Sequence, residues 1–157
     1  MKKEWLDPLG KMTYGIYVLT SRSGETVNAM IASWVTQVSY EPPLIMAAVH
    51  PNRFSHSLLE GETCFGLHVI DQGQKDLLAR FKGPDPLKKF SGIGWETKTT
   101  GAPILTDCIA WFELEIKERL APGNHTLFIG QIVACGCPGN GTPLTTLDYD
   151  GMYIGKS

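Results

Sequence analysis

Residues 28–43, NAMIASWVTQVSYEPP, decide what fold this chain is expected to adopt. The segment starts with apolar residues at the density of a strand and then places hydroxyl side chains at Ser33, Thr36 and Ser39. Burying a hydroxyl without a partner costs about 1–3 kcal/mol, so a packed strand gains nothing from them. Two interpretations stay open. One is a strand followed by a polar turn. The other is a segment in which hydroxyls hold a phosphorylated planar ligand and Trp34 covers its ring.

Length and composition predict one globular domain over residues 1–157, because 43% of the residues are hydrophobic and 19% are charged. The net charge of −2 gives no broad positive field, so we expect no nucleic-acid or membrane partner. No apolar run approaches the roughly 20 residues of a membrane span. The N-terminus has two lysines without an apolar segment after them, which does not resemble a signal peptide. A cytoplasmic location is therefore expected.

The four cysteines do not form a metal-binding pattern. Cys64 and Cys108 lie in apolar contexts and are predicted to be small buried side chains. Cys135 and Cys137 are separated by one residue instead of the two that are typical of zinc and redox pairs, and no second pair follows. We expect no metal site, and the role of these two cysteines stays open.

Hydrophobic periodicity predicts a mainly β chain with short helices. The repeated βαβ rhythm of a doubly wound sheet is absent, and the many glycines and prolines indicate turns, so a small barrel is favoured. Asn52 is expected to cap the first helix and Asp71 to start the second. Strands are predicted over residues 13–21, 26–32, 44–49, 63–69, 110–120, 125–135 and 147–154, and helices over 53–60 and 71–81.

The segment 110–120 alternates clearly between apolar and charged side chains. Because successive side chains of a strand point to opposite faces, its apolar residues are predicted to face the core and its charged residues the solvent. With the strand after it, the segment should form a long hairpin with one wet face. The predicted core side chains are Phe112, Leu114 and Ile116, and the predicted solvent-facing ones are Glu113, Glu115 and Lys117.

Residues 28–43 resemble the flavin-binding segment of the flavin reductase-like proteins, which are FMN-binding split-barrel proteins and include flavoredoxin-type electron carriers. The resemblance covers nearly the whole chain. It continues, in order, through residues 50–56 (HPNRFSH), 89–92 (KFSG), 101–105 (GAPIL) and 123–130 (GNHTLFIG). It implies a six-stranded antiparallel split β-barrel of the FMN-binding type with Greek-key connections. It also implies a homodimer with flavin near the subunit interface.

The segment HPNRFSH is the strongest phosphate candidate. Arg53 is a cationic donor at a predicted helix start, and Ser55 adds a hydroxyl in the first turn, where phosphates bind well. The family usually carries Asn-x-x-Thr-His here; this chain keeps Asn52 and has serine in place of threonine. The alternative is an ordinary helix cap with an exposed arginine. Lys89 matches a family lysine near the phosphate or ribityl end, and Lys82 is a weaker candidate.

His125 stands where the family usually has Gly-Asp-His, but here Asn124 replaces the aspartate. The amide supplies no charge that would raise the pKa of the imidazole. We expect His125 at the rim of the barrel, where it stabilises the negative charge that develops as flavin accepts hydride. The alternative is that it only caps the turn. His68, within a predicted strand, is expected to be structural.

The expected function is NAD(P)H-dependent flavin reduction, with FMN as cofactor, NADH or NADPH as co-substrate and His125 as catalytic residue. One alternative is a flavoredoxin-type carrier that exchanges electrons with a redox protein partner. Another is a split-barrel protein that binds no flavin. The choice between FMN and FAD, the nicotinamide preference and the electron acceptor stay open. The predicted flavin-binding residues are Asn28, Ser33, Trp34, Thr36, Val38, Ser39, His50, Asn52, Arg53, Ser55, Lys89, His125 and Tyr153.

Overall fold

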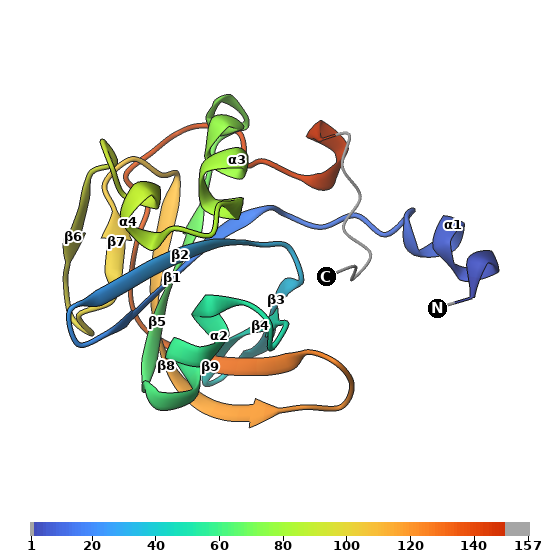
Figure 1. The fold of residues 1–157 in the computed structure, drawn as a ribbon, viewed down its shortest axis with the longest axis horizontal. Helices are drawn as coiled ribbons and strands as arrows, with labels where there is room; N and C mark the ends of the chain where they lie inside the picture. Colours follow the sequence, from blue (N-terminus) through green and yellow to red (C-terminus); the bar gives the residue numbers. More distant parts are fainter. Residues whose placement is uncertain (1, 150–157) are drawn as a thin grey trace.

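The computed structural model describes residues 2–149, and strands dominate it (Figure 1). The strands are β1 (Tyr17–Ser23), β2 (Thr26–Ala32), β3 (Val35–Tyr40), β4 (Pro43–Val49), β5 (Cys64–Val69), β6 (Trp95–Thr97), β7 (Pro103–Leu105), β8 (Ala110–Leu120) and β9 (Thr126–Gly136). Seven of them form one antiparallel sheet in the order β2-β1-β5-β8-β9-β4-β3, and β6 pairs with β7 in a second sheet.

The main sheet curls back on itself. Its two edge strands, β2 and β3, follow one another in the chain and are separated only by Ser33 and Trp34. The two edges must therefore approach each other, and the carbonyl oxygen of Trp34 accepts a 2.9 Å hydrogen bond from the backbone N–H of Ala48 on β4. The mainly β split barrel with short helices is confirmed. Its main sheet has seven strands where six were expected.

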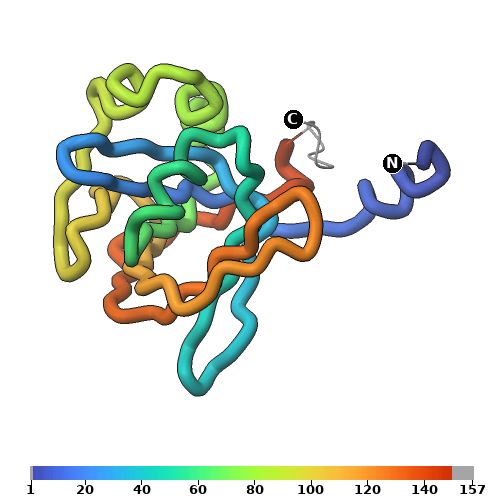
Figure 2. The backbone as a smooth tube through the Cα atoms, turned by 60° about the horizontal axis from the view of Figure 1, so that its bottom comes forward, coloured from blue at the N-terminus to red at the C-terminus, as the bar shows by residue number. Residues whose placement is uncertain are grey.

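The helices of the described chain are all short. They are η1 (Lys3–Trp5), α1 (Leu6–Leu9), α2 (Phe54–Gly61), η2 (Gln72–Gln74), α3 (Asp76–Lys82), α4 (Pro86–Lys89) and η3 (Thr146–Asp148). α2, α3 and α4 all contact β2, so three separate segments meet over one edge strand. η1 and α1 instead extend away from the sheet (Figures 1 and 2).

Two apolar clusters hold these layers together. The first lies within the curled sheet and is centred on large buried side chains such as Phe65 and Phe128. The second joins β1 and β2 to α3 and includes Leu78 and Phe81, the latter only 1% exposed. Burying such a side chain contributes roughly 1.5–3 kcal/mol. The second cluster therefore fixes the end of α3 against the sheet.

Three predicted local features differ from the structure. The helix over 71–81 is interrupted: Asp71 accepts a 2.7 Å hydrogen bond from the backbone N–H of Gly73 and caps η2, and α3 begins only at Asp76. Asn52 does not cap α2, because Arg53 is the N-cap residue and makes no side-chain cap hydrogen bond. The last strand, predicted from residue 147, begins instead in the helical turn η3, and residues 150–154 of that prediction lie outside the described chain.

The predicted wet face of β8 is also only partly correct. Glu113 is completely buried. Its carboxylate accepts hydrogen bonds from the backbone N–H groups of Thr99 and Thr100 at 3.0 and 2.8 Å, and from the Thr100 hydroxyl at 2.8 Å. Burial raises the pKa of Glu113, but these hydrogen bonds outweigh it and the net pKa is lowered. A carboxylate that accepts three hydrogen bonds can be buried. The alternation of apolar and charged residues along the strand does not reveal the groups that donate them.

The predicted burial of the cysteines holds for Cys108 and in part for Cys64. Cys108 is buried and Cys64 partly so, whereas Cys135 and Cys137 are exposed. Within residues 2–149, no group of histidine, cysteine and acidic side chains is arranged to hold a metal ion. None of the helices in that range is long and apolar enough to cross a membrane.

Candidate functional site

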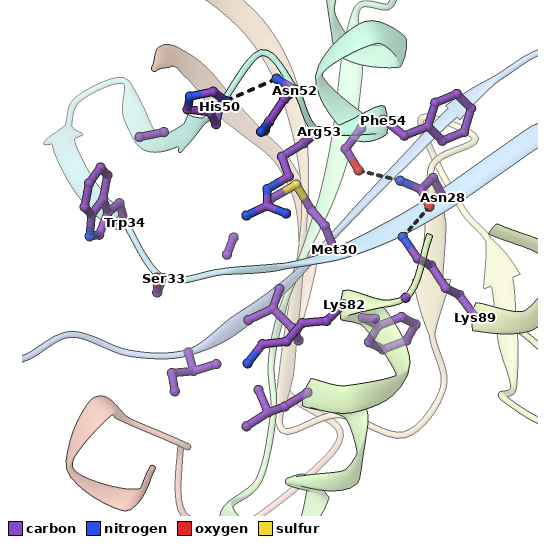
Figure 3. A pocket seen from close by; sticks show the side chains of 18 of the residues that line it. Asn28, Met30, Ser33, Trp34, His50, Asn52, Arg53, Phe54, Lys82 and Lys89 are labelled. Atoms are coloured by element: carbon purple, nitrogen blue, oxygen red, sulfur yellow. Dashed lines mark hydrogen bonds between the residues drawn. The ribbon is translucent and has the colours of Figure 1, made fainter. Parts of the chain in front are cut away.

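A cavity of about 440 Å³ lies where β2, the start of α2, the end of α3 and α4 meet (Figure 3). The segment that follows β9 closes one side of it through Thr146 and Tyr149. Most of the predicted flavin-binding residues line this cavity although they come from distant parts of the chain. They are Asn28, Ser33, Trp34, His50, Asn52, Arg53, Ser55 and Lys89.

A buried hydrogen-bonded chain forms one wall of the cavity. Lys89, the last residue of α4, is only 6% exposed. Its ammonium donates 2.9 Å hydrogen bonds to the side-chain oxygen of Asn28 and to the carbonyl oxygen of Ala29. The side-chain nitrogen of Asn28 in turn donates to the Ser55 hydroxyl at 2.8 Å. Both acceptors of the ammonium are neutral, and an ammonium has three donors.

The charge of Lys89 has no acidic counterpart in the described part of the chain, where no carboxylate oxygen lies within 4.0 Å of its ammonium. Burial lowers the pKa of Lys89, and the positive charge of Arg53 lowers it further. A buried cation that faces a second cation across a cavity is costly by itself. An anion bound between the two cations would offset both the burial of the Lys89 charge and its repulsion by Arg53.

Arg53 lies between the two ends of the cavity. It is the N-cap residue of α2 with an extended backbone (φ −84°, ψ 134°), and its guanidinium points into the cavity (Figure 3). Its charge affects the pKa of Lys89 on one side and of His125 on the other. Because no side chain caps α2, the N–H groups of its first turn and the guanidinium can face the same ligand.

An aromatic cluster forms the opposite end of the site. The ring of His125 lies 4.7 Å from that of Trp34 at an interplanar angle of 46°, and 5.0 Å from that of His50 at 84°. His50 is held by a 3.2 Å hydrogen bond that its Nδ1 accepts from the backbone N–H of Asn52. His125, predicted from sequence, is thus brought to the site by contact with two residues that line the cavity.

The protonation of His125 is set by its surroundings. Burial lowers its pKa, and the nearby His50 and Arg53 lower it further. Its Nδ1 lies 2.9 Å from the side-chain oxygen of Asn124. When Nδ1–H donates to this oxygen, the neutral ring carries its lone pair on Nε2, and only the protonated ring offers a second donor.

Several predicted residues do not line the cavity. Thr36 and Val38 are exposed on β3 and Ser39 is half-buried there, with a bulge between Gln37 and Ser39. The three hydroxyls of the 28–43 segment therefore do not form one surface, because only Ser33 precedes the strand. Tyr153 lies outside the described residues.

Other cavity residues were not predicted. Met30 lies beside Arg53 (Figure 3), Phe54 also lines the cavity, and Leu78 and Phe81 supply an apolar wall from α3. Periodicity predicted a helix over residues 71–81, but it does not indicate which strand the side chains of that helix face. Lys82, a weak candidate from sequence, also lines the cavity.

Comparisons with known proteins show the family to which this chain belongs. The family model described as "Flavin reductase like domain" matches residues 9–155. The chain is 34% identical over 129 residues to diflavin flavoprotein A 1 of Synechocystis, covering 79% of this chain and 22% of that protein. It is 28% identical to a ferric-chelate reductase (NAD(P)H) of Archaeoglobus fulgidus, covering 94% of this chain and 89% of the relative.

The structure is also similar to solved structures. An FMN-binding protein from Thermus thermophilus superposes with a TM-score of 0.73 at 33% identity, over 80% of this chain and 71% of that one. The chain spans only about a fifth of the length of the diflavin flavoprotein. In that relative the matching segment is therefore part of a much longer protein.

Proposed function

Since the chain belongs to the flavin reductase-like domain family, we propose that it is an FMN-binding oxidoreductase that reduces flavin with NADH or NADPH. One observation carries the proposal most strongly: among residues 2–149 the buried ammonium of Lys89 has only neutral hydrogen-bond acceptors, and it faces a cavity that also contains Arg53. Such a site is suited to a phosphate monoester, the group that FMN carries at the end of its ribityl chain.

The residues present fit the phosphate end of this ligand. Lys89 supplies a fixed donor, because its side chain is held by Asn28 and Ala29. Arg53 supplies a planar guanidinium that can bind two phosphate oxygens at once. The Ser55 hydroxyl accepts a hydrogen bond from Asn28 and keeps its own hydrogen to donate. Charge-assisted hydrogen bonds of this kind contribute roughly 1.5–3 kcal/mol each.

The residues also fit a planar ring system. Met30, Trp34 and Ala32 provide apolar and aromatic surface next to the cationic end of the cavity. Flavin held in this cavity would supply a hydride acceptor for the nicotinamide, so that two electrons could pass from the nicotinamide to the flavin. The protein has to orient both rings and exclude water, and the apolar wall from α3 serves this purpose.

His125 is proposed to act on the charge that develops during reduction. It contacts Trp34 and His50 at the rim of the cavity. A protonated ring would donate a hydrogen bond from Nε2 toward the ligand and stabilise the added negative charge. No proton from a side chain is needed at the moment of hydride transfer, so the proposed role is electrostatic. Thr36, Val38, Ser39 and Tyr153 remain proposed cofactor contacts on the family resemblance alone.

Two relatives support the choice of reactants. The ferric-chelate reductase carries NAD(P)H in its name and matches over almost its full length, which supports a nicotinamide co-substrate. The Thermus protein is named as FMN-binding, which supports FMN. The second candidate is an electron carrier that passes electrons between protein partners. It is favoured by the diflavin flavoproteins, in which the matching segment belongs to a longer chain.

Anaerobic mixing distinguishes the two functions. Protein loaded with FMN is mixed with NADH or NADPH, and the visible absorbance of the flavin is followed in the presence of excess free FMN. A reductase bleaches the bound flavin within seconds and goes on to reduce the excess. A carrier stays yellow with both nicotinamides but is bleached by a reduced rubredoxin or ferredoxin. The second result would replace the reductase proposal by the carrier.

A further inference from the structure

A third cation, Lys82, reaches the cavity from α3, whereas Lys89 reaches it from α4. It is the last residue of α3, and its ammonium extends into the cavity (Figure 3). Phe81, the residue before it, is buried in the second apolar cluster, so the backbone that carries Lys82 is fixed. The α3 wall therefore holds this charge at a defined place.

The ammonium of Lys82 is bound to a tyrosine and to no acid in the described chain. It donates a 2.6 Å hydrogen bond to the hydroxyl of Tyr149 and lies 4.6 Å from the centre of that ring. No carboxylate oxygen of residues 2–149 lies within 4.0 Å of it. The Tyr149 hydroxyl accepts a hydrogen bond from the lysine and keeps its own hydrogen. The pair therefore presents a charged ammonium donor and a neutral hydroxyl donor to a ligand.

We propose that Lys82 and Tyr149 form a second phosphate subsite, which takes the adenylate-side phosphate of a dinucleotide bound in the cavity. The inference rests on the proposed function and adds to it the residues that would hold a second phosphate. FMN has one phosphate, for which Lys89 and Arg53 already suffice. FAD and the nicotinamide dinucleotides have a pyrophosphate, and the additional cation that Lys82 supplies from α3 suits its second negative charge.

The exposure of the pair is consistent with this assignment. Lys89 is buried, whereas Lys82 is exposed and reaches the cavity from α3. A dinucleotide with its ring system inside the cavity would extend its adenosine half outward past an exposed cation. Exposure also leaves Lys82 room to exchange the tyrosine hydroxyl for phosphate without burying a new charge.

The test compares Lys82→Met, which keeps an unbranched side chain of similar length but removes the charge, with Lys88→Met as the matched control. Lys88 is exposed, pairs with Asp85 at 3.8 Å and does not line the cavity. Affinities of both variants and of the unaltered protein are measured by calorimetry for FMN, FAD, NAD⁺ and NADP⁺. Oxidised nicotinamides are used so that no reduction occurs during the titration.

We expect Lys82→Met to weaken the binding of FAD or of the oxidised nicotinamide dinucleotides at least tenfold, with less than a twofold change in the affinity for FMN. The ligand whose affinity falls is the one that supplies the second phosphate. Unchanged affinity for all three dinucleotides would overturn the subsite while the FMN site stands. An equal loss for FMN and FAD would also overturn it, because Lys82 would then serve the first phosphate. If the unaltered protein bound neither FMN nor FAD, the proposed function would fail first, and the nicotinamide titrations alone would decide the subsite.

Tyr149→Phe gives an independent measurement. It keeps the ring near Lys82 but removes the hydroxyl that accepts from the ammonium and donates to the phosphate. If the two residues share a second phosphate subsite, this variant should lose about threefold or more in affinity for the same dinucleotide whose binding Lys82→Met weakens. A loss for a different ligand in each variant would contradict a shared subsite.

Discussion

Lys89 donates a 2.9 Å hydrogen bond to the side-chain oxygen of Asn28, a residue 61 positions earlier in the chain. This contact joins α4 to β2 and places a charged donor at the cavity without an acidic partner in the described residues. An ion pair in its place would hold the two elements together as well but would cancel the charge. The use of an amide keeps the lysine available for an anion.

Asn28→Asp tests this relationship directly. The substitution places a carboxylate next to the Lys89 ammonium, so it should neutralise the cation and repel a phosphate. We expect FMN affinity to fall at least tenfold, which corresponds to about 1.4 kcal/mol, while the free energy of unfolding is maintained. FMN titration and urea unfolding measure the two quantities.

Asn28→Ala serves as the comparison for that variant. It removes the hydrogen bonds of the amide to Lys89 and Ser55 without adding a charge. We expect a larger loss of stability, about 1–3 kcal/mol because buried polar groups lose their partners, and a smaller loss of FMN affinity than in Asn28→Asp. The reverse order of the two affinities would show that the charge of Lys89 is unimportant for binding.

A change at position 124 should shift the pH dependence of flavin reduction. The pKa of His125 is lowered by burial, His50 and Arg53, so its protonated form is lost early as the pH rises. Asn124→Asp puts a carboxylate near Nδ1 and raises that pKa. If the protonated ring supports reduction, the decline of the rate moves to higher pH in the variant. His125→Ala should lower flavin affinity or reduction rate about ten- to a hundredfold.

Two outcomes of these measurements would contradict a catalytic role for His125. One is an unchanged pH profile in Asn124→Asp. The other is an unaltered affinity and rate in His125→Ala with only a lower melting temperature, which would identify His125 as a structural turn residue.

His68 should make the fold sensitive to mild acid. It is fully buried, its Nδ1 donates to the carbonyl oxygen of Val18 at 3.0 Å, and its Nε2 accepts from the backbone N–H of Leu105 at 3.0 Å. Burial lowers its pKa from 6.5 to about 4, although the hydrogen bond to Val18 opposes the shift. The unfolded chain therefore binds a proton between these two pH values while the folded protein does not, and stability falls as the pH falls through this window.

Between about pH 7 and about pH 5 this histidine should lower the free energy of unfolding by about 2 kcal/mol. His68→Gln, in which this position does not titrate, should be less stable at neutral pH. Its free energy of unfolding should nevertheless fall less on acidification than that of the unaltered protein. Urea unfolding at the two pH values tests this prediction. Equal losses in the two proteins would assign the acid sensitivity to other groups.

We propose that the protein is a homodimer, as the family resemblance implies. The β3–β4 hairpin projects from the body (Figure 2), and it exposes Tyr40 by 85% and Val38 by 49%. An exposed apolar edge strand favours pairing with a second copy. Sedimentation should show a dimer at micromolar concentration, and Tyr40→Arg should shift it toward monomer. A monomer that still binds flavin would contradict the proposal.

Much of the fold could be predicted because periodicity reports burial directly. The strand expected over 26–32 is β2, and the one expected over 110–120 is β8. Glu113 was misplaced because the threonine N–H groups that satisfy its carboxylate come from a loop that alternation does not describe. The interruption after Asp71 was missed for a similar reason, since its capping of η2 competes locally with a continuous helix.

The site was predicted in part. Arg53, Ser55 and Lys89 were assigned from charge, helix position and family resemblance, and the structure brings all three to one cavity. The role of Asn28 as the link between two of them depends on contacts across 27 and 61 positions, which no local pattern contains. The same holds for the wall that α3 contributes, because periodicity shows that a side chain is buried but not against what.

The most direct test of the flavin site is an FMN titration of the unaltered protein, Lys89→Met and the control Lys88→Met, followed by quenching of flavin fluorescence. Lys89→Met removes a buried charge and keeps an apolar side chain of similar length, but it leaves the acceptors on Asn28 and Ala29 without their donor, so we expect the free energy of unfolding to fall by no more than about 1–3 kcal/mol. We predict saturable binding to the unaltered protein and to Lys88→Met, and at least tenfold weaker binding to Lys89→Met under conditions in which urea unfolding shows that all three proteins are folded. Equal affinity in all three proteins, or no quenching by the unaltered protein, would contradict the assignment of this cavity as the flavin site.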